Sequence, residues 1–166
     1  MQAALARHDA ILRHGIEACD RMTRLVTQLM QLARADEAGH LASATSCELR
    51  TITEHVLADS APAAMQDRTS VALEASDPGR VLGDGALLEA LVRNLVDNAL
   101  RHGGPNGEVR VGLVQQDREV RLTVDDTGPG VTPEALERLG RRFYRAAEAT
   151  ATGSGLGLSI VKRIAE

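Results

Sequence analysis

The chain has 166 residues, which is enough for one hydrophobic core of ordinary size or for one domain with an appendage. Its 23 acidic and 19 basic side chains give a formal net charge of -4, which removes any general electrostatic reason to bind nucleic acid or an anionic membrane. Two cysteines without CxxC spacing favour a reducing compartment over a disulfide framework, and no apolar run approaches the length of a membrane span.

The first three dozen residues predict one long amphipathic helix. Apolar side chains recur at helical spacing, as at Leu12, Cys19 and Val26, and polar side chains occupy the opposite face. A wide apolar stripe needs a partner, so residues 1–37 are expected to form an arm of a helical bundle or coiled coil. Residues 38–46 collect small and polar side chains, which predicts a linker and a domain boundary.

The segment after the linker predicts an α+β domain over residues 47–166. Helical spacing from Glu48 to Ala58 indicates a second helix, which we expect a turn around Pro62 to end. Two short β-prone pieces follow at residues 69–74 and 80–82.

The rest of the domain predicts helices on either side of a hairpin. Asp84 is suited to cap a helix that runs to about Leu100. Alternating apolar residues at 109–113 and 120–124 predict an antiparallel hairpin with one buried face. A short helix from Thr132 to Gly140 and a last helix from Ser159 to Glu166 complete the expected elements.

An asparagine pair stands on the helix after Asp84, in the sequence NLVDNALRH. Asn94 and Asn98 are four residues apart, so their amides share one face, and Arg101 lies one turn further on. Amide oxygens are acceptable ligands for Mg²⁺, and Asn98 would be the direct ligand. Alternatively, both asparagines face solvent or cap while Asp97 pairs with its charged neighbours, and this motif alone leaves both interpretations open.

A carboxylate and a glycine turn follow the second strand of the hairpin, in VDDTGPG. Asp126 stands at the strand end, where the backbone turns tightly enough to approach a ligand. Because a carboxylate only accepts hydrogen bonds, it suits the amino group of adenine and should reject guanine. Taken singly, the sequence is equally good turn chemistry, and an ordinary turn is the favoured alternative.

A glycine-rich stretch, GSGLGL, opens the last predicted helix. Glycines let backbone N–H groups come close enough to an anion to bind it, and the helix N-terminus adds partial positive charge. The stretch is neither a Walker A loop nor a dinucleotide fingerprint, and by itself it is compatible with a flexible loop and a cap. The three motifs in this order nevertheless predict one nucleotide site.

Four motifs resemble those of the catalytic ATP-binding domain of two-component sensor histidine kinases, within the gyrase, Hsp90, histidine kinase and MutL ATPase superfamily. NLVDNALRH is similar to the N box, DTGPG to the first glycine box, RRFYR to the F box and GSGLGL to the second glycine box. The resemblance implies a two-layer α/β sandwich of the Bergerat type, a mixed sheet with helices on one face. It also implies ATP and Mg²⁺ as ligands.

The resemblance implies a role for each matching residue. Asn98 is expected to coordinate Mg²⁺, Asp126 to read adenine, and the segment from Phe143 to Thr152 to form a lid over ATP. The full set implied for the ATP site is Asn94, Asn98, Arg101, His102, Asp126, Gly128, Gly130, Phe143, Tyr144, Arg145, Gly153, Ser154, Gly155, Leu156, Gly157 and Leu158.

The N-terminal arm also resembles the family, since residues 24–37 look like the end of the second helix of the dimerisation and phosphoacceptor hairpin. The family's phosphorylated histidine lies in an H-E-x-x-x-P segment, and none of the five histidines here has that context. The family's domain also continues past the last helix, so we expect a piece truncated at both ends.

The activity implied by the resemblance is transfer of the γ-phosphoryl group of ATP to a histidine and then to a response-regulator aspartate. Implied partners are a phosphoacceptor helix, a response regulator and a second copy through the arm. The implied location is the cytoplasmic portion of a membrane-anchored sensor. A non-catalytic nucleotide-gated interaction module and an anti-sigma-type serine kinase stay open, although the arm argues against the second.

Overall fold

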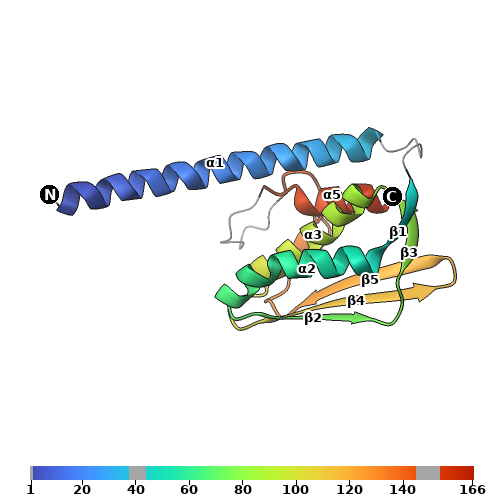
Figure 1. Cartoon of the computed structure of the whole chain (residues 1–166). Coiled ribbons are helices and arrows are strands. Elements are labelled where there is room, and N and C mark those ends of the chain that lie inside the picture. Colours follow the sequence, from blue (N-terminus) through green and yellow to red (C-terminus); the bar gives the residue numbers. More distant parts are fainter. Residues whose placement is uncertain (1, 38–43, 145–153) are drawn as a thin grey trace.

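The computed structural model describes residues 2–37, 44–144 and 154–166, which form a long helix lying over an α+β domain (Figure 1). The helices are α1 (Gln2–Glu37), α2 (Leu49–Gln66), α3 (Gly85–His102), α4 (Pro133–Leu136) and α5 (Gly157–Ala165). The strands are β1 (Thr45–Glu48), β2 (Ser70–Ala75), β3 (Arg80–Gly83), β4 (Glu108–Gln116) and β5 (Glu119–Asp126).

The main sheet is mixed and has the order β2-β4-β5, with β2 parallel and β5 antiparallel to the central strand β4. A separate antiparallel pair joins β1 to β3. The helices α2 and α3 lie together on one face of the main sheet (Figure 1). The expected α+β sandwich, with helices on one face of a mixed sheet, is therefore confirmed.

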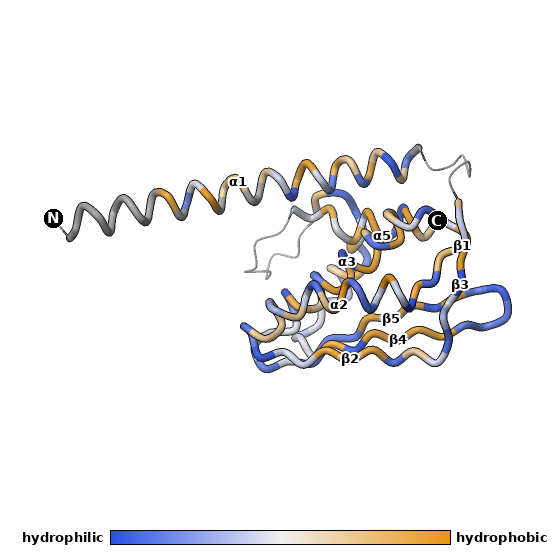
Figure 2. Tube along the Cα trace, in the orientation of Figure 1, coloured by the Kyte–Doolittle hydropathy of each residue, from blue (hydrophilic) through white to orange (hydrophobic). Residues whose placement is uncertain are grey.

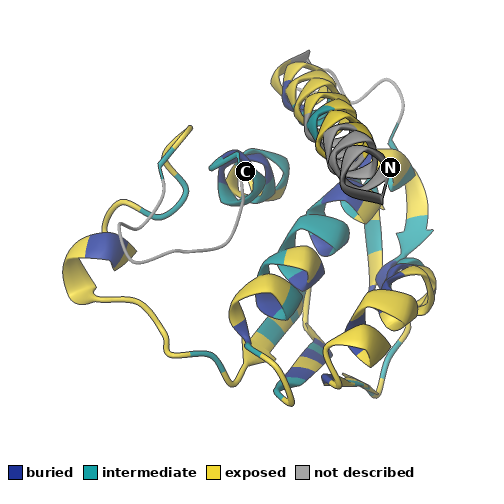
Figure 3. Ribbon diagram, turned by 90° about the vertical axis from the view of Figure 1, so that its left-hand side faces the viewer, coloured by how far each residue is buried: buried dark blue, intermediate teal, exposed yellow. Residues whose placement is uncertain are grey.

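The core lies between this sheet face and the two helices. On β4, Val109, Val111 and Leu113 are fully buried while the residues between them are more accessible, as the alternation of a strand dictates. Val92 and Val96 of α3 belong to the same buried cluster as Val109 and Val111. Apolar segments of the main sheet and of α2 and α3 are coloured orange in Figure 2, and buried segments dark blue in Figure 3. Each buried valine stabilises the fold by about 1.5–3 kcal/mol.

Helix α3 begins where the sequence predicts. The Asp84 side chain accepts hydrogen bonds from the backbone N–H groups of Ala86 at 2.8 Å and Leu87 at 3.3 Å. These bonds satisfy two donors that the first helical turn leaves without intrahelical partners. The buried valines fix one face of α3 to the sheet, so its asparagine face is directed away from the core.

The structure corrects the expected end of the second helix. α2 continues through Pro62 to Gln66 instead of ending at a turn there. Proline removes one helical hydrogen bond, at a cost of about 3 kcal/mol. Ser60 and Ala64 on either side are buried against the domain, and this packing keeps the helix intact.

The linker prediction is also wrong in part. Residues 45–48 form β1, which pairs with β3 and adds an ion pair of 2.9 Å between Glu48 and Arg80. Four residues show too little periodicity to reveal a strand whose partner lies far along the chain. Residues 38–43 of the expected linker lie outside the described residues.

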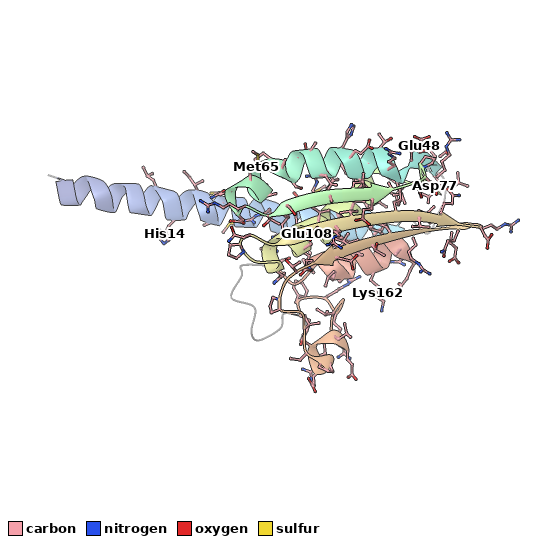
Figure 4. All side chains as sticks on the ribbon, turned by 90° about the horizontal axis from the view of Figure 1, so that it is seen from below. His14, Glu48, Met65, Asp77, Glu108 and Lys162 are labelled. Carbon is pink, nitrogen blue, oxygen red and sulfur yellow. The ribbon has the colours of Figure 1, made fainter. Side chains whose placement is uncertain are left out.

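The arm α1 has two distinct parts. Its N-terminal part projects beyond the domain, as the position of His14 in Figure 4 shows. Exposed apolar side chains extend from this part into the C-terminal third of the helix: Leu12, Ile16, Met22, Leu25, Val26, Leu29 and Met30. Its C-terminal third lies against α5 and α3, where Leu32 and Ala35 are buried. No helix within the described ranges has the length and apolar character required to cross a membrane.

Candidate nucleotide-binding site

A cavity of about 400 Å³ lies where α3, α5, the segment after β5 and the C-terminal third of α1 meet. Its lining comes from all three predicted motifs and from the arm. The lining residues are Gln28, Asn94, Asp97, Asn98, Arg101, His102, Asp126, Pro129, Gly130, Val131, Thr132, Leu139, Gly140, Arg141, Tyr144, Ser154, Gly155, Gly157 and Leu158.

Helix α3 supplies one wall through its asparagine face. The amide nitrogen of Asn94 donates to the Ala90 carbonyl at 2.7 Å, which leaves the amide oxygen available. That oxygen lies so close to Gly157 that a Cβ added there would be 2.9 Å from it. Asn98 is half-buried one turn further on, and both asparagine side chains line the cavity.

Asp97 lies on the same wall and has a perturbed acidity. Its carboxyl group is accessible through the cavity, but the surrounding walls bury it enough to raise its pKa. The positive charges of Arg101, Arg93 and Arg24 act in the opposite direction. In the alternative interpretation of this motif, Asp97 pairs with Arg93 and Arg101. Among the described residues Asp97 forms no ion pair within 4.0 Å, and Arg93 binds other carboxylates.

Those carboxylates are Asp59 and Glu89, which bind the Arg93 guanidinium at 2.8 Å and 2.9 Å. Arg93 is therefore directed toward α2 and the preceding turn of α3. Asp97 is left with its charge facing the cavity.

The end of β5 supplies the opposite wall. Asp126 accepts a hydrogen bond from the Gly128 N–H at 2.8 Å, which fixes one carboxylate oxygen and the turn that follows. A Cβ on Gly128 would collide with the carbonyl oxygen of His102. Only glycine permits this approach, which brings the carboxylate of Asp126 to the C-terminal end of α3.

The glycine stretch before α5 supplies the third wall. Gly155 has φ +71 and its carbonyl accepts a hydrogen bond from the Phe143 N–H at 2.9 Å. A Cβ on Gly155 would lie 2.7 Å from the Phe143 carbonyl carbon, so a side chain does not fit there. This contact holds the two ends of the segment between residues 144 and 154 together.

The cavity therefore has chemically different ends. At one end, the carboxylate of Asp126 accepts hydrogen bonds. At the other end, the first N–H groups of α5 and the nearby glycines suit an anion, since helix N-termini carry unsatisfied donors and partial positive charge. The amides of Asn94 and Asn98 stand next to this anion end.

Comparison with known proteins identifies the family. Residues 83–166 match the family described as "Histidine kinase-, DNA gyrase B-, and HSP90-like ATPase", which is just over half of the chain. The chain belongs to this family. The match covers the asparagine pair, both glycine motifs and α5, so the predicted resemblance is confirmed.

Similar proteins are sensor kinases. The chain is 45% identical over 164 residues to the sensor protein QseC of Escherichia coli O157:H7, covering 97% of this chain and 35% of that protein. It is 37% identical over 148 residues to the sensor protein kinase PmrB of Pseudomonas aeruginosa, covering 89% of this chain and 31% of that protein. The chain thus spans about a third of the length of these relatives.

A solved structure shares the arrangement of arm and domain. The full-length histidine kinase ShkA in complex with AMPPNP has a TM-score of 0.73 and 29% sequence identity, covering 89% of this chain and 31% of that chain. Because the coverage exceeds the length of the ATPase domain alone, the likeness includes part of the arm.

Most residues implied by the ATPase family line the cavity. They are Asn94, Asn98, Arg101, His102, Asp126, Gly130, Tyr144, Ser154, Gly155, Gly157 and Leu158. Gly128 stands behind this lining and shapes the turn. Arg145, Gly153 and most of the expected lid lie outside the described residues.

Two implied side chains do not line the cavity. Phe143 is 65% exposed, and only its backbone touches the glycine stretch. Leu156 is fully buried and packs with Leu32 and Ile160 in a second apolar cluster. Any contact of Leu156 with a nucleotide would therefore have to use its backbone.

Several lining residues were missed by sequence reasoning. Pro129, Val131 and Thr132 adjoin the first glycine box, and Arg141 stands in the F box, so their positions offered a signal. Asp97 was considered only as a partner of its charged neighbours. Gln28 offered no local signal, because it reaches the cavity only through the packing of α1.

Proposed function

We propose that this chain is the ATP-binding catalytic part of a sensor histidine kinase in two-component signalling, which donates the γ-phosphoryl group of ATP to a histidine. The observation that supports it most is one cavity with a carboxylate at one end and asparagine amides beside a helix N-terminus at the other. This arrangement suits a ligand with an amino-bearing base and a polyphosphate. The relatives' names point to the same reaction class.

The base end would select adenine. Asp126 lines the cavity with one carboxylate oxygen bonded to Gly128, and its second oxygen would accept from the base. The adenine amino group donates to such an oxygen, whereas guanine presents an acceptor at the corresponding position. A mismatch leaves a buried group unpaired, at about 1–3 kcal/mol.

The phosphate end would hold Mg²⁺ through Asn98, with Asn94 supporting the phosphates and Arg101 contacting them. The donor set fits a hard cation, because amide oxygens are available and the remaining ligands would be phosphate oxygens and water. Within the described ranges, no cluster of three His, Cys, Asp or Glu side chains competes as a metal site. A bound Mg²⁺ would neutralise charge on the transferring phosphoryl group.

The phosphoryl acceptor would come from a helix that carries a histidine beside an acidic residue. None of the five histidines of this chain stands in an H-E-x-x-x-P sequence. Transfer depends on an aligned nucleophile, so the residues described here would bind and orient ATP without completing the reaction. Further partners would be a response regulator and a second copy packed on the exposed apolar stripe of α1, in the cytoplasm.

Two measurements test this proposal. Titration calorimetry should show Mg²⁺-dependent ATP binding with GTP weaker by about 5- to 150-fold, and Asp126→Asn should lose this preference. Equal affinity of the parent chain for ATP and GTP would contradict the adenine assignment.

Labelling distinguishes the alternatives. With γ-labelled ATP, the chain alone should gain no acid-labile phosphate, whereas a separately made acceptor helix should gain some. Binding without transfer to any helix would favour a nucleotide-gated interaction module, and acid-stable label on a partner protein would favour a serine kinase.

A further inference from the structure

Residues 24–36 of α1 meet the domain along a ridge of side chains, beside which Ala35 is also buried. The ridge consists of Arg24, Gln28, Leu32 and Asp36, which are spaced four residues apart. Arg24 acts electrostatically on Asp97 of α3. Gln28 lines the nucleotide cavity.

Two of these residues fix the arm to α5 and its surroundings. Leu32 is 5% exposed and packs against Leu156. The Asp36 carboxylate accepts from Arg163 at 2.8 Å and from Arg142 at 3.2 Å. Apolar burial and two ion pairs therefore hold Gln28 at a defined distance from the glycine stretch.

Gln28 is bonded directly to that stretch. The Ser154 hydroxyl donates to the Gln28 amide oxygen at 2.6 Å and accepts from the Leu156 N–H at 3.2 Å. Both capacities of the hydroxyl are used, so the bond orients the Gln28 amide group. Within the described ranges, the Gln28 amide nitrogen has no protein acceptor, although the residue lines the cavity.

The nitrogen stands at the anion end of the cavity. Ser154 lies three residues before α5 begins at Gly157 and is bonded to the Leu156 N–H at the start of that helix. A neutral N–H donor beside a helix N-terminus suits a phosphate oxygen. The Gln28 amide is uncharged, so it would not form an ion pair with Asp97 in place of a bond to phosphate.

We propose that Gln28 is a nucleotide-binding residue supplied by the arm: its amide oxygen holds Ser154, and its amide nitrogen donates to a phosphate oxygen of the bound nucleotide. This inference rests on the proposed ATP-binding function. It makes the nucleotide site incomplete without the docked arm. By linkage, nucleotide phosphates then strengthen arm docking by the same factor by which docking strengthens their binding.

The test compares Gln28→Ala and Gln28→Glu by titration calorimetry with Mg²⁺-ATP and with adenosine. Alanine removes both hydrogen bonds, and ATP affinity should fall on the order of tenfold. Glutamate keeps an acceptor for Ser154 but replaces the donor by a negative charge, so ATP affinity should fall further still. Adenosine affinity should stay within about twofold of the parent in both variants, which also verifies the fold.

The matched controls are Gln31→Ala and Gln31→Glu, because Gln31 lies on the same helix without lining the cavity. They carry the same changes of volume and charge and should bind ATP like the parent. Parent-like ATP affinity of Gln28→Glu would overturn the donor role and leave Gln28 as a positioning residue for Ser154. If Gln28→Glu and Gln31→Glu lose ATP affinity equally, the loss comes from the added negative charge and not from a specific contact of Gln28.

Failure of the proposed function gives a different result. A parent chain that binds neither ATP nor ADP rejects the ATP-binding function and this inference together. A parent chain that binds ATP while both Gln28 variants bind it equally well rejects the inference alone.

Discussion

The two sides of the nucleotide cavity are built in different ways. The α3 side is one face of a helix whose other face is buried against the sheet, through residues such as Val92 and Val96. The α1 side is held by a small apolar cluster around Leu32 and by solvent-accessible ion pairs of Asp36. The first side is therefore as stable as the domain, whereas the second should open separately and respond to salt and pH.

The largest effect should come from the buried core of the domain on which the α3 side rests. Leu113→Ala removes a fully buried side chain and should lower the free energy of unfolding by about 2–5 kcal/mol, measured by urea denaturation. Leu82→Ala is the control, because Leu82 is 76% exposed and should change stability by less than about 0.5 kcal/mol. Similar losses in both variants would show that the sheet face is not the main source of stability.

The next effect concerns the ligand chemistry of the α3 side. Asn98→Ala should weaken Mg²⁺-dependent ATP binding by about 1.5–3 kcal/mol, because it removes an oxygen near the charged phosphates. Binding of metal-free adenosine, measured by the same calorimetry, should barely change. If both ligands lose affinity equally, Asn98 has a structural role.

A smaller and local effect is expected on the α1 side. Leu32→Ala should reduce hydrogen-exchange protection of α1 residues 24–36 by about 2 kcal/mol, while the urea midpoint of the domain stays nearly unchanged. Leu29→Ala is the matched control, since Leu29 is 49% exposed on the same helix. Loss of protection throughout the domain would mean that both sides unfold as one unit.

The smallest effect should depend on pH. Hydrogen bonding to Arg163, with a further contribution from Arg142, lowers the pKa of Asp36 below its ordinary value. A carboxyl group with a lowered pKa stabilises the docked arm above its ordinary pKa and loses that contribution as the pH falls through the lowered value.

Asp36→Asn should therefore reduce protection of residues 24–36 at pH 7, and the difference from the parent chain should disappear in acid. Hydrogen exchange at several pH values checks this, and added salt at pH 7 should shrink the difference as well. A difference that persists at a pH below the lowered pKa of Asp36 would assign the effect to lost packing.

The sequence predicted those features that depend on residues close together in the chain. The Asp84 cap, the asparagine spacing on α3 and the glycine turn after Asp126 are each set by residues within a few positions of one another. These features predicted the α3 side of the cavity, with the Asp126 carboxylate at one end and a site for an anion at the other. Local alternation predicted the antiparallel pair of β4 and β5, whereas the mixed sheet as a whole was implied by the resemblance.

What could not be predicted depends on distant contacts. Gln28 and Ser154 are 126 residues apart, and only the crossing of α1 over α5 brings them together. The strand β1 and the passage of α2 through Pro62 likewise depend on partners that periodicity does not reveal. The pKa of Asp97 follows from walls that several elements contribute.

The four-residue spacing of the contacts on α1 has a mechanical consequence. An α-helix turns about 100° per residue, so each step of four residues advances the contact line by about 40° around the axis. Rotation of α1 and its sliding along α5 are therefore coupled, like the motion of a screw. The four side chains on this line differ in chemistry: a positive charge, an amide, an apolar group and a carboxylate. A shift of α1 by one turn would therefore place Arg24 or Leu32, instead of Gln28, next to Ser154. The arm thus has one axial register in which every contact is satisfied.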